Sequence, residues 1–191
     1  MYYSNKALVP EQNKFDELIS APTEWPLLFR GLRMNGPWED RTPRVYLLGN
    51  PFVWWGSFFS LVLYLILFAI YYVFSSRGIP LITTGMWERY KFGGKLFLGG
   101  WVLHYLPFFV IGRVTYLHHY FPALLFAIGM FAFMFDHFIR VASLNVRRVT
   151  SLALIALFSF AFWVFREIPY GMTVPVNGMQ HAQWLQSWHI V

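Results

Sequence analysis

The chain has 191 residues, of which 57% are hydrophobic, 21% aromatic and only 13% charged. A soluble domain carries roughly 25% charged residues, so the composition excludes an ordinary water-soluble globular protein. Long apolar runs separated by short basic connectors instead predict an all-α membrane protein.

The formal net charge of +6 does not indicate a nucleic-acid partner. Lysine and arginine lie between the apolar runs, and the sequence has no zinc-finger spacing, RNP-like aromatic motif or basic block. The absence of cysteine excludes disulfides, thiolate catalysis and Cys-ligated metal sites. We therefore expect no nucleic acid and no metal, and interpret the positive charge as a determinant of membrane topology.

Residues 1–50 are polar and proline-rich, and we expect a membrane-adjacent segment there. A short helix is predicted from Pro10 to Ile19, with Pro22 as its stop. Met1 to Pro10 lacks the basic and apolar regions of a signal peptide. If this segment is luminal, we expect an upstream segment to carry it across the membrane.

The apolar runs within residues 51–166 predict about four transmembrane helices. No charged residue occurs from Val45 to Ser76, which makes the first span the clearest. Asp136 and Arg140 stand four residues apart near the end of another run, a spacing that favours an ion pair. The expected spans are about 53–74, 96–112, 118–139 and 149–166, and residues 167–191 form an aromatic polar tail.

Two connectors, 77–95 and 140–148, hold most of the lysine and arginine of the bundle. The positive-inside rule predicts that both are cytoplasmic, so residues 1–50, the 113–120 turn and the tail share the luminal face. Aromatic residues near the predicted span ends match an interfacial belt: Trp54, Trp55, Tyr71, Tyr72, Trp163 and Tyr170.

The turn from Arg113 to Tyr120 is the richest in polar groups that can bind a ligand. Arginine has a planar fork of donors suited to phosphate, and His118, His119 and Tyr120 add further donors. A lipid phosphate lies at this membrane depth, so these residues are candidates for binding it. The alternative is that Arg113 snorkels to the interface while the His and Tyr side chains anchor the helix end.

His104 falls inside a predicted span, where ionisable groups are rare and usually face a bundle interior or polar cavity. A neutral, hydrogen-bonded packing role is at least as good an interpretation. The acidic pairs Asp16-Glu17 and Glu39-Asp40 are typical of a solvated surface. His118 and His119 lack a nearby acidic third ligand, which argues against a metal site.

Several sequence motifs resemble the C-terminal four-helix region of the dolichyl-phosphate-mannose–protein mannosyltransferases. The most specific runs from Gly100 to Phe109 and from Arg113 to Ala123. Shorter matches follow in order: Ser4 to Pro10, Trp25-Pro26, Gly31 to Met34, Tyr46 to Pro51, Tyr170 to Met172 and Trp184 to Trp188. The sequences of Ser4 to Pro10 and Arg113 to Ala123 are most similar to those of a fungal subfamily that forms heterodimers. Asn35 to Trp38 departs from the family pattern, which affects only local loop geometry.

The resemblance implies a multi-pass enzyme of the endoplasmic-reticulum membrane with a GT-C type fold. Such an enzyme transfers mannose from dolichyl-phosphate mannose to Ser or Thr hydroxyls of secretory proteins, without a cofactor, and the expected partner is a second mannosyltransferase. Its catalytic acidic pair lies in the first luminal loop, which this chain does not match, so catalysis is not assigned to Asp16 or Glu17.

The expected contribution of this chain is lipid-phosphate binding and bundle packing, with Arg113, His118, His119, Tyr120 and His104 as candidate residues. An acidic group must activate the acceptor hydroxyl, and cationic groups must hold the departing phosphate. We expect the isolated chain to lack activity. The alternative hypothesis is a non-enzymatic membrane scaffold or assembly subunit, and a truncated gene model is compatible with the same sequence.

Overall fold

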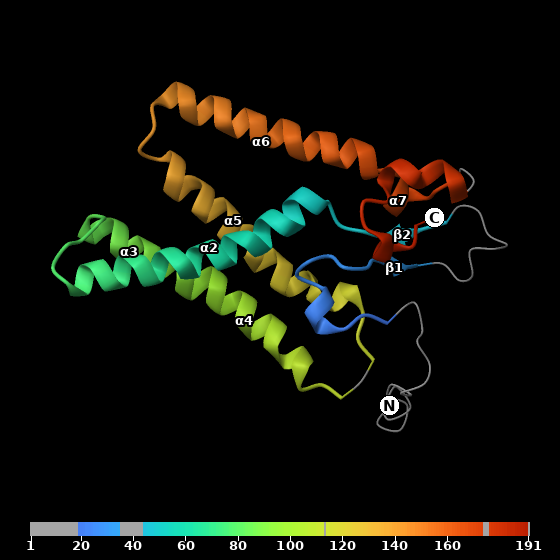
Figure 1. The fold of residues 1–191 in the computed structure, drawn as a ribbon, viewed down its shortest axis with the longest axis horizontal. Coiled ribbons are helices and arrows are strands. Elements are labelled where there is room, and N and C mark those ends of the chain that lie inside the picture. The colour runs from blue at the N-terminus through green and yellow to red at the C-terminus, as the bar shows by residue number, and fades with distance from the viewer. Residues whose placement is uncertain (1–18, 35–43, 113, 174–175, 191) are drawn as a thin grey trace.

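The computed structural model describes residues 19–34, 44–112, 114–173 and 176–190. Figure 1 shows a bundle of long helices and, at one end, a cap of short helices, strands and loops. The α-helices are α2 (Pro51–Ser76), α3 (Thr84–Gly93), α4 (Gly99–Tyr105), α5 (Phe121–Ile139), α6 (Leu144–Phe165) and α7 (Glu167–Tyr170). The strands are β1 (Leu32–Arg33) and β2 (Tyr46–Leu47). Shorter helical turns are Pro22–Glu24, Gly94–Leu98, Leu106–Phe109, Leu117–Tyr120, Val176–Ala182 and Gln186–Trp188.

Helix α2 begins and ends at residues that suit its termini. The Asn50 side chain accepts hydrogen bonds from the backbone N–H groups of Phe52 (3.1 Å) and Val53 (3.3 Å), which caps the first turn. At the other end Gly78 has φ +75°, a left-handed conformation that stops a helix readily. The first predicted span, residues 53–74, therefore lies within one continuous helix.

Helix α5 is the centre of the bundle and packs against both α2 and α4. Its buried side chains recur at helical spacing on one face: Ala123, Ala127, Met130 and Met134. Small residues at such a face allow neighbouring helices to approach closely. Helix α6 has only Ala161 and Phe165 buried, so nearly all of its apolar surface faces outward.

Of the predicted spans, three correspond to helices long and apolar enough to cross a membrane: Pro51–Ser76, Leu117–Ile139 and Leu144–Phe165. The fourth, 96–112, belongs to a helical path from Thr84 to Phe109 that a π-helical turn interrupts at Gly94–Leu98. A crossing by this interrupted path remains a prediction.

Both basic connectors are shorter than predicted because a hydroxyl caps the helix that follows each one. Thr83 Oγ1 accepts a hydrogen bond from the Met86 N–H at 3.3 Å, so α3 begins inside the expected 77–95 connector. Ser143 caps α6 in the same way through the Val146 N–H at 3.5 Å. The second half of the 140–148 connector, from Leu144 onward, is consequently helical.

The predicted ion pair between Asp136 and Arg140 is wrong. The Asp136 carboxylate accepts from the Arg89 guanidinium at 2.6 Å, so it joins α5 to α3 rather than two turns of α5. The guanidinium of Arg89 also lies 5.0 Å from the centroid of the Phe133 ring, which holds it at this helix junction.

Helices α2 and α3 are joined by a reciprocal pair of tyrosines. Tyr64 donates to the Tyr90 carbonyl at 3.2 Å and Tyr90 donates to the Tyr64 carbonyl at 3.0 Å. Their rings stack with centroids 4.6 Å apart. Gly94 lies against this pair, and a Cβ atom there would collide with the Tyr64 phenol.

Gly94→Ala is therefore expected to lower the free energy of unfolding by about 1–3 kcal/mol, the usual effect of overpacking. Gly85→Ala in α3 is the matched control, because no atom lies within 4 Å of its Cβ position. Thermal unfolding of both variants in detergent, followed by near-ultraviolet circular dichroism, measures the difference. Equal midpoints for the two variants would show that the α2–α3 contact tolerates the extra methyl group.

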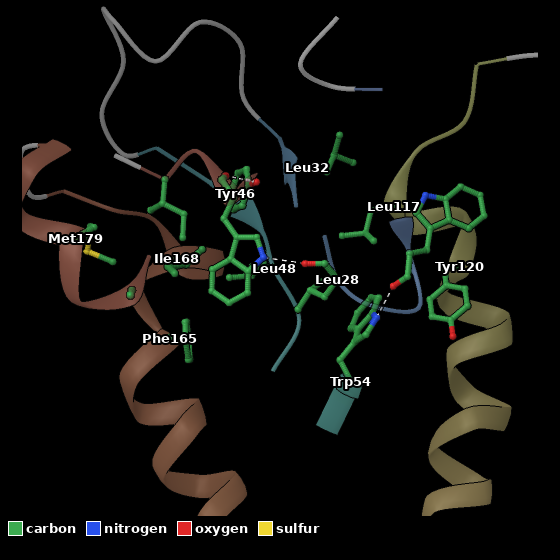
Figure 2. Packing of buried hydrophobic residues seen from close by; sticks show 14 of the residues in the cluster. Leu28, Leu32, Tyr46, Leu48, Trp54, Leu117, Tyr120, Phe165, Ile168 and Met179 are labelled. Atoms are coloured by element: carbon green, nitrogen blue, oxygen red, sulfur yellow. Dashed lines mark hydrogen bonds between the residues drawn. The ribbon is translucent and has the colours of Figure 1, made fainter. Parts of the chain in front are cut away.

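The cap is held by tryptophan side chains that reach one turn of the chain, residues 25–28. Trp54 Nε1 donates to the Trp25 carbonyl (2.6 Å) and Trp55 Nε1 to the Leu27 carbonyl (2.7 Å). Trp188 Nε1 donates to the Leu28 carbonyl at 2.8 Å. Figure 2 shows Trp54 pointing into this core, so Trp54 does not belong to an exposed aromatic belt as predicted.

The segments that precede and follow the helical bundle in sequence share this core. Strands β1 and β2 pair antiparallel, with Leu32 opposite Leu47, and Arg44 forms an isolated bridge with Met172. The C-terminal segment, predicted as a tail, is thus a structural part of the cap. The largest fully buried side chains of the cap include Trp25, Leu28, Leu117, Tyr120, Ile168, Met179 and Trp188.

Candidate functional site

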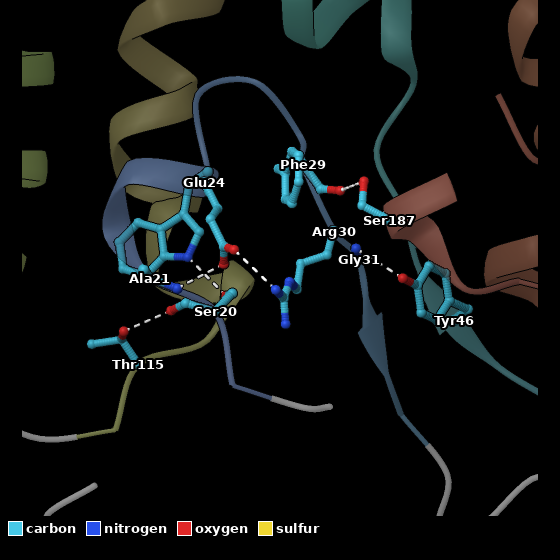
Figure 3. A network of polar contacts seen from close by, with 10 residues as sticks. Ser20, Ala21, Glu24, Phe29, Arg30, Gly31, Tyr46, Thr115 and Ser187 are labelled. Carbon is cyan, nitrogen blue, oxygen red and sulfur yellow. Dashed lines mark hydrogen bonds and ion pairs between the residues drawn. The ribbon is translucent and has the colours of Figure 1, made fainter. Parts of the chain in front are cut away.

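The 114–120 turn leads into α5, and hydrogen bonds between Thr115 and Ser20 connect it to the cap. The Ser20 N–H donates to the Thr115 carbonyl (3.1 Å), and Thr115 Oγ1 donates to the Ser20 carbonyl (2.8 Å). Trp25 Nε1 donates to Ser20 Oγ at 2.9 Å. Figure 3 shows Ser20 beside Thr115, with the hydrogen bond between them drawn as a dashed line. The N-terminal segment therefore fixes where the histidine pair lies.

A second contact fixes the conformation of that segment. The Glu24 carboxylate accepts from the Ala21 N–H at 2.9 Å and pairs with the Arg30 guanidinium at 3.2 Å. Tyr105, from α4, donates to the Pro22 carbonyl at 2.9 Å. These bonds tie residues 20–30 together and connect them to α4.

His118 and His119 stack on each other with ring centroids 4.3 Å apart, yet their surroundings differ. His119 packs between Trp25 (6.3 Å) and Phe108 (5.4 Å). Its Nδ1 accepts a hydrogen bond from the Tyr116 N–H at 3.0 Å. His119 is therefore held in place by the cap and its own turn.

His118 is exposed, and its ring stacks on Tyr116 at 5.7 Å on the surface of the turn. Within the described part of the chain no hydrogen bond involves its imidazole nitrogens. The imidazole nitrogens of His118 are consequently open to a ligand, whereas Nδ1 of His119 is engaged by the Tyr116 N–H.

Tyr120 is a packing residue in this structure, with 1% of its surface exposed. Its hydroxyl accepts a hydrogen bond from Trp101 Nε1 at 2.9 Å, and its ring lies 5.6 Å from that of Trp54. Tyr120 thus connects α4, the start of α5 and the start of α2, and its role at the turn is to hold these helices together.

His104, for which the sequence left both a site role and a neutral packing role open, is exposed on α4. Its Nδ1 lies 2.8 Å from the Gly100 carbonyl of its own helix, and its ring stacks on Phe126 of α5 at 5.0 Å. These contacts match the packing interpretation, and none of them reaches His118 or His119.

Arg113 lies outside the described residues, as do Asp16, Glu17, Glu39 and Asp40. Among the described residues no group of three His, Asp or Glu side chains is arranged to hold a metal ion. The turn as described therefore offers an exposed imidazole beside a buried aromatic support. This arrangement suits the binding of an anion through a hydrogen bond from the imidazole.

Comparison with known proteins adds a family model and several relatives. Residues 1–188 match the family model described as the C-terminal four TMM region of protein-O-mannosyltransferase. The chain is 34% identical over 201 residues to dolichyl-phosphate-mannose–protein mannosyltransferase 2 of Candida albicans, covering 100% of this chain and 26% of that protein. It is 37% identical over 191 residues to mannosyltransferase 6 of Saccharomyces cerevisiae, covering 100% of this chain and 25% of that protein.

A solved structure is similar as well. The S. cerevisiae protein O-mannosyltransferase Pmt1–Pmt2 complex bound to the sugar donor superposes with a TM-score of 0.79 at 29% identity. The superposition covers 98% of this chain and 25% of the matched chain. The chain thus spans about a quarter of the length of the relatives that it matches.

Proposed function

Because the chain belongs to the protein O-mannosyltransferase family, we propose that it is the C-terminal membrane region of an enzyme that mannosylates secretory proteins. The proposed donor is dolichyl-phosphate mannose, the acceptor is a Ser or Thr hydroxyl, and the compartment is the endoplasmic reticulum. The match over nearly the whole chain, in sequence and in fold, supports this proposal.

The proposed role of this chain is to hold the lipid phosphate as it leaves the sugar. When the acceptor oxygen attacks the anomeric carbon, the bond from that carbon to the phosphate oxygen breaks and negative charge builds on the phosphate. Preorganised cationic and hydrogen-bonding groups stabilise such charge. An acidic residue from another part of the enzyme takes the proton of the attacking hydroxyl.

The exposed His118 ring carries the proposal among the described residues. Its imidazole nitrogens are accessible, while His119 and Tyr120 are engaged by Tyr116 and Trp101. We assign the phosphate contact to His118 together with Arg113, and a positioning role to His119 and Tyr120. The proposal leaves His104 out of the candidate phosphate-binding residues, because its ring stacks on Phe126.

By similarity to the Pmt1–Pmt2 complex, the proposed partner is a second mannosyltransferase of the same family. A non-enzymatic scaffold, the alternative function, does not require the hydrogen-bond donors of the 113–120 turn. Substitutions there that preserve folding therefore separate the two functions.

His118→Ala is expected to lower turnover about ten- to a hundredfold, because one hydrogen bond to a charged group is worth roughly 1.5–3 kcal/mol. The measurement uses a chimera in which this chain replaces the matching segment of S. cerevisiae mannosyltransferase 6. Initial rates are taken with dolichyl-phosphate mannose and an acceptor peptide at matched protein levels. His181→Ala, which removes another exposed cap histidine, is the control and should retain the parental rate. Full activity of His118→Ala would remove His118 from the site.

A further inference from the structure

A second polar feature lies at the end of the bundle opposite the cap, where α5 ends and α6 begins (Figure 1). An open cleft of about 640 Å³ separates the last turns of α5 from the first turns of α6. Arg147, Arg148 and Ser151 line it from α6. The proposed mannosyl transfer makes no use of these residues.

The cleft has an excess of positive charge. Arg147 and Arg148 are both exposed, and within the described part of the chain neither has an acidic partner at ion-pair distance. Asp136 also lines the cleft, but its carboxylate is paired with Arg89 at 2.6 Å. Adjacent cations near a helix N-terminus repel each other and the positive end of the helix dipole. An anion in the cleft would relieve both repulsions.

The remaining wall of the cleft is apolar. Phe135 and Ile139 line it from α5, and Leu152 from α6. Leu152 stands four residues after Arg148 and Ser151 four after Arg147, so charged and apolar groups share one helical face. Because α5 and α6 are both long and apolar enough to span a membrane, this face passes from the membrane boundary toward its hydrocarbon interior.

We propose that this cleft binds an anionic glycerophospholipid. The phosphate and headgroup lie against the guanidinium groups of Arg147 and Arg148 and the hydroxyl of Ser151. An acyl chain follows Phe135, Ile139 and Leu152 into the membrane. Guanidinium groups bind phosphate oxygens through paired donors, and basic pockets between transmembrane helices are a recurrent form of lipid-headgroup site. The combination of a basic rim with apolar walls fits a lipid better than a soluble phosphate.

The test measures lipid selectivity with the purified 191-residue chain reconstituted in phosphatidylcholine vesicles. Spin-labelled phosphatidylinositol and spin-labelled phosphatidylcholine are compared by the fraction of motionally restricted label. We expect phosphatidylinositol to associate about thirtyfold more strongly, since each of the two arginines near an anionic lipid contributes on the order of 1 kcal/mol. Circular dichroism of each variant in the same vesicles checks that its helices are intact.

The double variant Arg147→Gln/Arg148→Gln is expected to bind phosphatidylinositol and phosphatidylcholine about equally. Arg77→Gln/Lys91→Gln removes the same charge from the same end of the bundle but outside the cleft, and should keep the selectivity. Leu152→Trp leaves the charges and fills the apolar wall, so it should also lose the preference. Retained selectivity in the Arg147/Arg148 variant, or an equal loss in the Arg77/Lys91 variant, would overturn the site. Displacement of the labelled lipid by millimolar inorganic phosphate would contradict the lipid assignment.

Discussion

Trp188→Ala is expected to open the cap and to cost about 3–5 kcal/mol of stability, the usual range for truncating a buried aromatic side chain. The indole is fully buried, donates to the Leu28 carbonyl at 2.8 Å and packs on Phe165 with centroids 5.9 Å apart. The Trp188 carbonyl also accepts from the Tyr46 hydroxyl, which in turn accepts from the Gly31 N–H at 2.9 Å. Trp188 thus links the C-terminal segment to the N-terminal one, through its indole to Leu28 and through its backbone carbonyl to Tyr46.

Thermal unfolding in detergent and limited proteolysis measure this effect. Trp163→Ala is the matched control, because Trp163 on α6 is 61% exposed and contributes nothing to the cap core. We expect rapid cleavage around residues 166–190 in the Trp188 variant and an unchanged pattern in the control. A Trp188 variant as protease-resistant as the parent would mean that the C-terminal segment is not needed to close the cap.

The long helices were predictable because a run without charges has few alternatives to a buried or membrane-spanning helix. The exact helix starts were missed, since Thr83 and Ser143 lie within basic loops and their capping role was not recognised. The partner of Asp136 was missed for a different reason. Spacing along one helix allowed Arg140, but the packing of α3 on α5 brings Arg89 within 2.6 Å.

The cap could not be predicted, because its contacts join residues far apart in sequence. Ser20 meets Thr115 and Leu28 meets Trp188, and no periodicity encodes either contact. The same contacts determine that His119 is covered and His118 is exposed. Neighbouring histidines looked equivalent in the sequence, yet the ring of His119 is covered by Trp25 and Phe108 while His118 is exposed.

The second large effect is expected at Arg113, the candidate phosphate ligand that lies outside the described residues. Removing one preorganised charged donor from a transition state costs roughly 3 kcal/mol, or about a hundredfold in rate. Arg113→Lys should restore only part of that loss, because an ammonium group cannot reproduce the paired donors of a guanidinium. If Arg113 were an interfacial anchor, lysine would snorkel equally well and the rate would be nearly normal.

The most direct test of lipid-phosphate binding by this chain is the initial rate of mannose transfer by Arg113→Ala and Arg113→Lys in the mannosyltransferase 6 chimera. The measurement is made at saturating dolichyl-phosphate mannose and equal membrane levels, after helix insertion has been verified for each variant. The account predicts a fall of about a hundredfold for alanine and an intermediate rate for lysine. Parental rates for both variants would contradict it.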